Sequence, residues 1–261
     1  MNQQDIQAAA AILWQHWQQS TRLDELPAQC RPQTRIEAYA IQSEIARRSG
    51  QRVVGWKIAA TSKAGQQHIR VDGPIAGPLL SARGLEPGAA IPLAESNMKV
   101  VEAEFAFRIA RDLPERPEAY SVEQVLSAVA SLHPAIEVPD SRYADFTRVG
   151  AAQLIADLAC GCWFVIGPEV RADWRARDLV RHGVALWRNG AVAGRGSGVN
   201  VLGDPRGALA WIANELRIYG GGLRAGDVVI TGTCVTPVPV AAGDAVKADF
   251  GDLGALEVRF V

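Results

Sequence analysis

The alternation of apolar and polar residues is clearest between residues 99 and 109. Val101, Ala103 and Phe105 alternate there with Glu102 and Glu104, and the alternation continues to residue 109. A period of two residues is typical of a β-strand with one apolar and one polar face. The pattern therefore predicts a strand that places both glutamates on its polar face, about 6.6 Å apart at a rise of about 3.3 Å per residue.

Helical patterns fill most of the first 50 residues. The segment 8–17 is rich in apolar residues at helical spacing. The stretch Thr34–Glu37 has the capping-box pattern, in which Ser or Thr is followed three residues later by Glu. It predicts a helix that runs to Ser49 and ends at a glycine. A strand over residues 52–60 is predicted to follow.

Turn residues divide the rest of the chain into short elements. A second capping box at Ser121 predicts a helix to about Leu132, followed by a strand over residues 136–138. These signals predict an α+β fold with a mostly antiparallel or mixed sheet, divided into a helical part (1–50) and a β-rich domain (51–261). The last third is predicted to contain a hairpin at Asn189-Gly190, a helix from Pro205 to Tyr219, and strands over 228–231, 245–250 and 256–260.

Composition narrows the class of protein. The chain has 261 residues, 48% of them hydrophobic, so it can form a large core. Its net charge is -1. It has no basic block of the kind that binds nucleic acid, and no apolar run near the roughly 20 residues of a membrane helix. The N-terminus lacks the features of a secretion signal, and four scattered cysteines do not form a disulfide framework. We expect a cytoplasmic enzyme without a nucleic-acid or membrane partner.

The paired glutamates are candidates for metal binding. Like charges held this close repel each other unless a cation or a proton lies between them. Glu137 adds a third carboxylate, which is flanked by apolar residues. Three carboxylates without His or Cys suit a hard divalent ion such as Mg²⁺ or Mn²⁺. The alternative is a solvated face of an antiparallel sheet.

Lys57 is a candidate for acid/base chemistry because it lies between Trp56 and Ile58 in the strand predicted over residues 52–60. A free lysine titrates near 10.4, and burial or a nearby divalent cation would lower this pKa toward neutrality. The alternative is a lysine that extends its amine to solvent at a strand edge. The stretch Thr231–Thr233 can place hydroxyl and backbone N–H groups in a site, or it is simply a turn after a strand.

Several short segments, taken together in order, resemble the 2-oxo-4-pentenoate hydratase / 4-oxalocrotonate decarboxylase family, which belongs to the fumarylacetoacetate-hydrolase fold group. The resemblance extends from about residue 35 to the C-terminus. It is carried by Gly55-Trp56-Lys57-Ile58 with Thr61-Ser62-Lys63, Val101-Glu102-Ala103-Glu104-Phe105 with Asp112-Leu113-Pro114, Pro134-Ala135-Ile136-Glu137 with Asp140-Ser141-Arg142, Gly194-Arg195-Gly196, Thr231-Gly232-Thr233 and Ala242-Gly243-Asp244.

The resemblance implies a rolled, barrel-like mixed β-structure with surrounding helices, after a helical N-terminal part. It implies that Glu102, Glu104 and Glu137 hold Mg²⁺ or Mn²⁺ and that Lys57 is the acid/base residue. Members of the family assemble as homo-oligomers, often pentamers or decamers. The substrate-binding residues implied for this chain are Ser62, Asp157, Cys160, Gly161, Thr231 and Thr233.

The implied activity is a metal-dependent hydratase of a 2-hydroxy-2,4-dienoate or 2-oxo-4-enoate in aromatic catabolism. A 4-oxalocrotonate-type decarboxylase and an acylpyruvate hydrolase, with His133 as its base, are alternatives on the same scaffold. A non-catalytic binding member is a further alternative, because three positions depart from the family's pattern. Leu158 and Cys160 replace Asn and Ser in a segment that binds the substrate's acid end, and Ile75 replaces an acidic residue.

Overall fold

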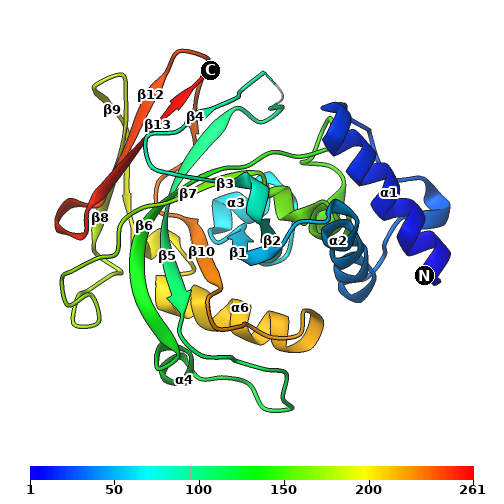
Figure 1. Cartoon of the computed structure of the whole chain (residues 1–261), viewed down its shortest axis with the longest axis horizontal. Helices are drawn as coiled ribbons and strands as arrows, with labels where there is room; N and C mark the ends of the chain where they lie inside the picture. The colour runs from blue at the N-terminus through cyan, green and yellow to red at the C-terminus, as the bar shows by residue number, and fades with distance from the viewer. Residues whose placement is uncertain (95) are drawn as a thin grey trace.

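A curled mixed sheet of eight strands forms the centre of the computed structural model, which describes residues 1–94 and 96–261 (Figure 1). A second sheet of five strands lies beside it, and the helices lie around the large sheet. This is the α+β fold that the sequence patterns predict, with the rolled sheet that the family resemblance implies. The helices are α1 (Gln3–Gln19), α2 (Arg35–Ser49), α3 (Lys63–His68), α4 (Val122–Leu126), α5 (Gly150–Ala156) and α6 (Pro205–Tyr219). The strands are β1 (Val53–Ala59), β2 (Ile75–Leu80), β3 (Gly84–Leu85), β4 (Ala90–Ile91), β5 (Val100–Ile109), β6 (Val129–Val138), β7 (Trp163–Ile166), β8 (Gly183–Arg188), β9 (Ala191–Ser197), β10 (Val228–Thr233), β11 (Val238–Pro239), β12 (Ala245–Asp249) and β13 (Ala255–Phe260).

The large sheet has the strand order β2-β1-β10-β5-β6-β7-β3, with β11 paired to β5. Alternation along β5 assigns its residues to two faces. Val101, Ala103, Phe105 and Phe107 are at most 1% exposed and belong to the main hydrophobic core. The other face of the sheet carries a small apolar cluster of its own and the glutamates of β5. The members of that cluster are Leu79, Ala106, Ala135, Phe164, Val228 and Ile230.

The second sheet has the order β4-β13-β12-β8-β9. Phe250, just after β12, makes an edge-to-face contact with Phe105 of β5, which joins the two sheets through the core. The predicted hairpin is confirmed, because β8 and β9 are connected by Asn189 and Gly190 with φ of 52° and 80°. Positive φ at both central residues is what a type I′ turn requires.

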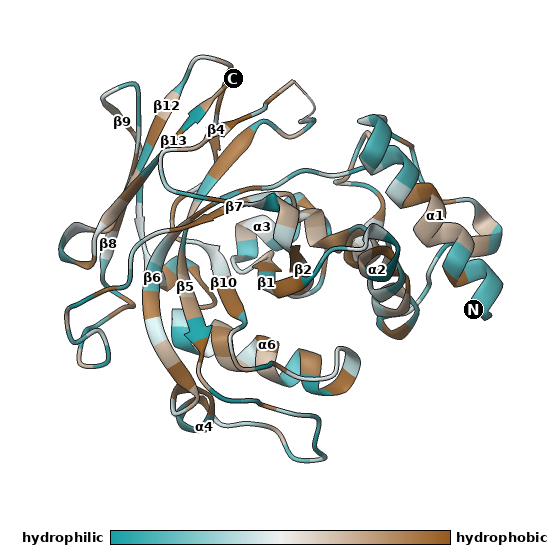
Figure 2. Cartoon of the chain, in the orientation of Figure 1, coloured by the Kyte–Doolittle hydropathy of each residue, from teal (hydrophilic) through white to brown (hydrophobic). Residues whose placement is uncertain are grey.

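The N-terminal helices lie at the end of the molecule away from the second sheet (Figure 1). Helix α2 begins and ends where the sequence predicts. Thr34 accepts a hydrogen bond from the backbone of Glu37, and Gly50 adopts the left-handed conformation that ends the helix. Helix α1 is longer than the apolar segment indicated, since Asn2 caps it. The two ends of α1 are polar, whereas the strands of the large sheet consist largely of apolar residues (Figure 2). The division at residue 50 into two domains stays a prediction.

The helix predicted from Ser121 to Leu132 is wrong in its extent. Ser121 does cap a helix, but α4 ends at Leu126, and β6 already begins at Val129. The reason is a tertiary contact, because residues 129–137 pair with residues 102–109 of β5. Sheet formation here overrides the local helical signal.

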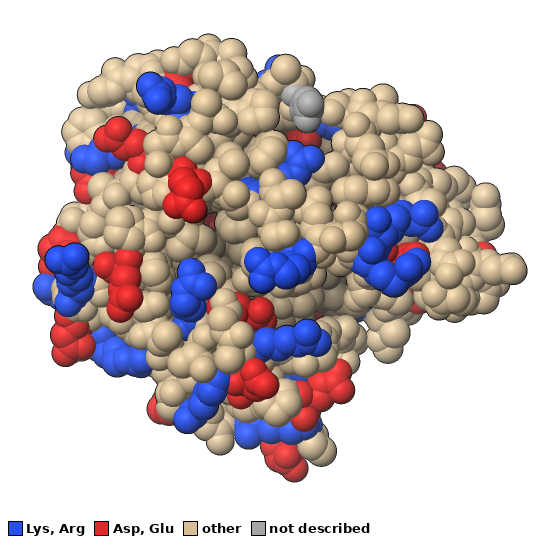
Figure 3. All heavy atoms as spheres, viewed as in Figure 1, with Lys and Arg blue, Asp and Glu red and all other residues tan. Residues whose placement is uncertain are grey.

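Helix α6 has the predicted bounds and buries a stripe that includes Leu209, Ile212 and Leu216. No helix among the described residues is long and apolar enough to cross a membrane. On the face seen in Figure 3, Lys and Arg side chains are interspersed with Asp and Glu, without a large region of one sign.

Candidate active site

Three glutamates from β5 and β6 meet on the face of the large sheet opposite the main core. Glu102 lies directly across the strand pair from Glu137, and Glu104 lies one pleat further along β5. Carboxylate oxygens of all three lie within 4.8 Å of one another. Glu104 and Glu137 are at most 1% exposed, whereas Glu102 is partly exposed. The convergence expected of these residues is therefore present, and it is not a solvated face.

Most of the buried carboxylate oxygens lack a hydrogen-bond donor. Glu104 accepts one hydrogen bond through Oε2, from the backbone N–H of Gly232 at 2.6 Å. Its Oε1 and both oxygens of Glu137 accept no hydrogen bond from the described part of the chain, and the cation beside them there is the amine of Lys57, 3.0 Å from Oε1 of Glu137. One ammonium does not balance three carboxylates. Buried carboxylates without donors are costly unless a cation lies beside them. An all-oxygen donor set of this kind fits a divalent metal ion.

Electrostatics in the cluster supports the same assignment. The pKa of Glu102 is raised to about 7, mainly because the carboxyl is buried and secondly because it lies near the charge of Glu137. Burial and the charges of both neighbours raise the pKa of Glu104 well above its usual range. Three such groups are not all ionised near neutral pH unless positive charge compensates them. A dication beside Lys57 would supply that charge.

Lys57 extends from β1 into this cluster and is 2% exposed. Its Nζ donates a hydrogen bond to the carbonyl of Ala159 at 2.9 Å and lies 3.0 Å from Oε1 of Glu137. Burial lowers the pKa of Lys57, but the charges of Glu137 and Glu102 outweigh burial, so the pKa is raised overall. The expectation that burial would bring it toward neutrality is wrong for the protein without a cation.

The carbonyl that binds Lys57 belongs to a strained turn. Leu158, Ala159 and Cys160 all have left-handed backbones, with φ of 54°, 51° and 60°. Each such residue costs roughly 1–2 kcal/mol for an L-amino acid, so a run of three needs support. One support is a hydrogen bond of 2.8 Å from the N–H of Gly161 to the carbonyl of Leu158. A second is the close packing of Gly77, where a Cβ would lie 1.9 Å from the same carbonyl oxygen.

The predicted substrate-binding residues next to this turn have structural partners. Asp157 is 1% exposed, and its carboxylate accepts a hydrogen bond from Ser141 at 2.7 Å and forms an ion pair with Arg142. The carbonyl of Gly161 accepts from the same arginine at 3.2 Å. Cys160 is buried, and burial raises its thiol pKa to about 12, so the thiol stays protonated.

The hydroxyls predicted to bind substrate also contact backbone atoms. Ser62 accepts a hydrogen bond from Gly65 at 3.0 Å and so caps α3. Thr231 donates to the carbonyl of Phe105 at 3.1 Å, and Thr233 donates to that of Val235. The substrate-binding roles of Ser62, Thr231 and Thr233 stay predictions.

The stretch Thr231–Thr233 was expected to place backbone N–H groups in a site, and the N–H of Gly232 holds Glu104 in this way. This glycine has φ of 102°, and a Cβ there would lie 2.2 Å from Oγ1 of Thr61. The carbonyl of Ala159, which holds Lys57, was not predicted, and the sequence contains no signal for it. Among the departures from the family's pattern, Ile75 is fully buried in the main core.

Comparison with known proteins identifies the family. Residues 80–261 match the model of the fumarylacetoacetate (FAA) hydrolase C-terminal family. The chain is 37% identical to a 2-keto-4-pentenoate hydratase of Burkholderia vietnamiensis over 228 residues, 85% of each chain. It is 33% identical to a 4-oxalocrotonate decarboxylase of Pseudomonas sp. strain CF600 over 231 residues, 87% of this chain and 86% of the relative. The structure of the decarboxylase from Pseudomonas putida G7, complexed with magnesium and adipate, superimposes with a TM-score of 0.90 at 28% identity and covers 100% of this chain and 99% of that one. The chain therefore belongs to the fumarylacetoacetate hydrolase family.

Proposed function

We propose that this protein is a divalent-metal-dependent hydratase that converts a 2-hydroxy-2,4-dienoate, through its unsaturated 2-oxo form, into a hydroxylated 2-oxo acid. The observation that carries the proposal is the convergence of Glu102, Glu104 and Glu137 within 4.8 Å, with the amine of Lys57 3.0 Å from Glu137. Relatives named hydratases that cover most of the chain support this reaction class.

The three glutamates would hold the cation. Carboxylates without nitrogen or sulfur ligands favour Mg²⁺ or Mn²⁺, and the magnesium complex of the decarboxylase relative favours Mg²⁺. When bound, the cation supplies Lewis acidity that stabilises negative charge on the 2-oxo oxygen of the substrate. The backbone N–H of Gly232 keeps Glu104 in place for this role.

Lys57 would hold and move the proton. The carbonyl of Ala159 and the carboxylate of Glu137 fix the position of Nζ, and the buried setting excludes bulk water. The carboxylates raise the pKa of this amine, while burial lowers it. Once positive charge neutralises the carboxylates, burial dominates and the pKa falls toward the range in which a lysine exchanges protons near neutral pH. Nζ can then protonate the carbon skeleton of the dienol.

A decarboxylase is the second candidate, because the superposition on 4-oxalocrotonate decarboxylase covers the whole chain. Loss of CO₂ needs the same stabilisation of negative charge at the 2-oxo oxygen. An acylpyruvate hydrolase is less well supported, since its proposed base is engaged elsewhere. His133 lies four residues before Glu137 on β6, and its two ring nitrogens contact Ser131 and the carbonyl of Gly167. We further expect a homo-oligomer, a pentamer or a decamer, as the family resemblance implies.

The test is to follow two substrates by NMR in the presence of Mg²⁺. With 2-hydroxypenta-2,4-dienoate we expect a hydroxylated 2-oxo acid, and chelation of the metal should abolish its formation. With 4-oxalocrotonate, release of CO₂ would instead assign the decarboxylase. Turnover that persists in excess EDTA, or no conversion of either compound with metal present, would refute the proposed function.

A further inference from the structure

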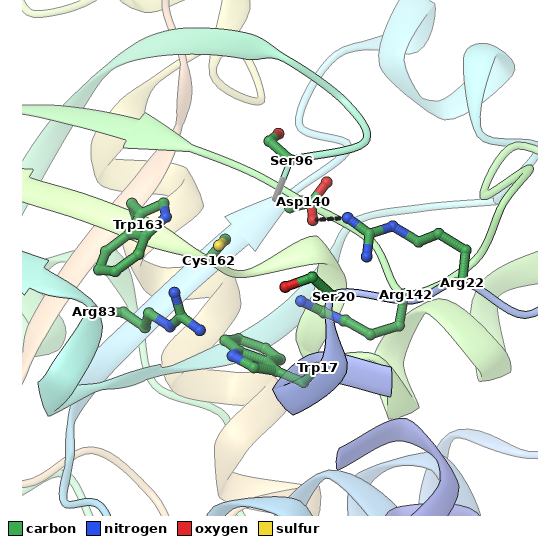
Figure 4. A pocket seen from close by; sticks show the side chains of 9 residues that line it. All are labelled: Trp17, Ser20, Arg22, Arg83, Ser96, Asp140, Arg142, Cys162 and Trp163. Atoms are coloured by element: carbon green, nitrogen blue, oxygen red, sulfur yellow. Dashed lines mark hydrogen bonds and ion pairs between the residues drawn. The ribbon is translucent and has the colours of Figure 1, made fainter. Parts of the chain in front are cut away.

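The side chain of Arg142 lies beside the strained turn that binds Lys57. Arg142 follows five residues after Glu137, so the segment that leaves β6 contains a proposed metal ligand and then this arginine. The arginine is 2% exposed. The ring of Trp17, near the end of α1, has its centre 4.2 Å from the guanidinium carbon, and Figure 4 shows the two side chains next to each other. Arg142 is therefore enclosed between α1 and the turn.

The donors of Arg142 reach both ends of this turn. Its Nη2 donates a hydrogen bond to the carbonyl of Asp157, which precedes the three left-handed residues. Its Nη1 donates to the carbonyl of Gly161, which follows them, at 3.2 Å. Both bonds come from one rigid, planar guanidinium. They therefore restrict the separation of the two carbonyls, and with it the path of the three residues between them.

The carboxylate of Asp157 fixes the guanidinium in turn. Nε of Arg142 donates to Oδ1 of Asp157, and the backbone N–H of Arg142 donates to Oδ2 at 3.0 Å. The hydroxyl of Ser141 donates to the same Oδ2 at 2.7 Å. Asp157 and Ser141 are at most 1% exposed. Both oxygens of this carboxylate are thus engaged by residues 141 and 142, and the plane of the guanidinium is set by them.

The restrained turn directs one backbone group at the proposed active site. The carbonyl of Ala159, in the middle of the turn, accepts the hydrogen bond from Nζ of Lys57 at 2.9 Å. The other contact of Nζ is Oε1 of Glu137, at 3.0 Å, and in the proposed function that carboxylate also holds the cation. The Ala159 carbonyl is therefore the contact of the amine that the cation does not share, and its direction depends on the turn that Arg142 spans.

An ion pair that served only the stability of the fold would not need an arginine at this position. A buried ion pair gains little over apolar side chains of similar volume, because both charges lose their hydration. Apolar side chains cannot supply several donors in one plane. Here two of the three guanidinium nitrogens donate to the backbone of the turn rather than to the carboxylate. Backbone strain persists only where the surrounding structure over-determines it, and these bonds supply that restraint.

We propose that Arg142 is a positioning residue of the reaction. Anchored by Asp157, it holds the turn in the conformation in which the carbonyl of Ala159 binds and orients Lys57. The inference rests on the proposed function, in which Nζ of Lys57 moves the proton. Loss of Arg142 should then lower kcat, because the amine is no longer held in place. It should leave the affinity for Mg²⁺ unchanged, because the three glutamates set that affinity.

Two variants separate positioning from stability. Arg142→Met leaves the carboxylate of Asp157 buried without its cation, which is strongly destabilising. The paired variant Arg142→Met/Asp157→Asn removes both charges and keeps the shape and an acceptor at residue 157. Thermal unfolding should show that it regains stability relative to Arg142→Met. Arg177→Met/Asp252→Asn removes an ion pair that is about half exposed and is the matched control, for which we expect wild-type stability and kcat.

Steady-state kinetics with 2-hydroxypenta-2,4-dienoate and Mg²⁺ measures the effect on rate. We expect kcat of the paired variant to be about 10- to 100-fold lower than wild type, as for a reacting group displaced by about 1 Å, with calorimetric Mg²⁺ affinity unchanged. Arg142→Lys keeps the charge but has no planar fork to span both carbonyls, so its kcat should fall as well. Wild-type kcat in either variant would overturn the inference, because a purely structural ion pair predicts that rate recovers together with stability.

A double-mutant cycle shows whether Arg142 acts through Lys57. In a Lys57→Met background the paired substitution should lower kcat no further, because the group that it positions is already absent. A loss by the same factor in both backgrounds would overturn the inference, since independent effects multiply.

A crystal structure of the paired variant with Mg²⁺ tests the geometry without turnover. We expect residues 158–160 to leave the left-handed region and the carbonyl of Ala159 to move out of hydrogen-bond distance of Nζ of Lys57. An unchanged turn with this hydrogen bond intact would overturn the inference. If the wild type converts neither proposed substrate while the turn rearranges in the variant, the proposed function fails and the role of Arg142 in holding Lys57 stands.

Discussion

Replacing Glu104 with glutamine tests whether the three carboxylates form one dication site. Glu104 is fully buried between the other two, and its Oε2 accepts the hydrogen bond from Gly232. Glutamine has nearly the same shape, and its amide oxygen can accept the same bond. The substitution therefore removes one negative charge and leaves the packing intact. We expect opposite effects on metal binding and on the stability of the metal-free protein.

The magnitude follows from the spacing of the carboxylates. Two unit charges at the upper limit of the separation, 4.8 Å, interact by about 3.5 kcal/mol at an effective dielectric constant of about 20, and closer charges interact more strongly. Glu104 has two like-charged neighbours and is attracted by one lysine. With the lysine taken at the same separation, the net repulsion that the substitution relieves is about 3.5 kcal/mol when all are ionised. The same charge attracts a dication, so losing it should lower Mg²⁺ affinity by two or more powers of ten, at about 1.4 kcal/mol for each.

The gain in stability depends on pH with a definite sign. The pKa of Glu104 is raised in the folded protein, so the wild type loses stability as the pH rises above the unfolded-state pKa near 4.3. The glutamine side chain of the variant does not titrate. Glu104→Gln should therefore unfold at nearly the wild-type temperature at pH 5 and at a higher temperature at pH 8, both in EDTA.

Calorimetric titration with Mg²⁺ and thermal unfolding in EDTA measure the two effects. Glu169→Gln, at an exposed position, is the control for loss of a carboxylate outside the site. Wild-type Mg²⁺ affinity in Glu104→Gln would refute its assignment as a ligand. A lower unfolding temperature than wild type in EDTA at pH 8 would refute the argument that the buried carboxylates repel one another.

Three further outcomes are expected. Lys57→Met should lower kcat about 10²-fold or more if Nζ moves the proton, while calorimetry should find Mg²⁺ binding retained; a rate near wild type would end the catalytic role. Mg²⁺ affinity should rise from pH 6 to pH 8 as Glu102, whose pKa is about 7, releases its proton. A calorimetric affinity that does not change with pH over this range would contradict the role of Glu102 as a ligand. Gly77→Ala should cost about 2 kcal/mol or more and lower kcat, because its Cβ would overlap the Leu158 carbonyl; Gly73→Ala, with open space around it, is the control in thermal unfolding and steady-state kinetics.

The alternation along β5 was enough to predict that Glu102 and Glu104 share a face, because side-chain direction in a strand has a period of two. It did not determine that Glu137 lies opposite Glu102. That depends on the register of β5 with β6, which no local pattern encodes. The apolar neighbours of Glu137 made it a candidate, the family resemblance implied that it joins the other two, and pairing of the two strands gives the physical reason.

The helix predicted to Leu132 fails for a related reason. A capping box at Ser121 marks where a helix begins, but it carries no information on where the helix ends. The segment after Leu126 has a long partner strand available, and pairing with β5 stabilises it as β6. The sign of the Lys57 pKa shift likewise depends on partners from other strands. Local sequence predicts elements well here and predicts interactions between elements poorly.

The turn at Leu158–Cys160 is the part of the site furthest from sequence prediction. It contains no glycine, although all three residues have left-handed backbones, so local propensity argues against the conformation observed. Contacts with Gly77 and Gly161, from outside the three residues, stabilise it. The result is a carbonyl directed at Lys57. Backbone strain of this kind is found most often at functional sites, and here it lies beside the amine and the carboxylates. Leu158 and Cys160 can therefore differ from the family's usual residues without disturbing Lys57, since it is the backbone of the turn that holds the amine.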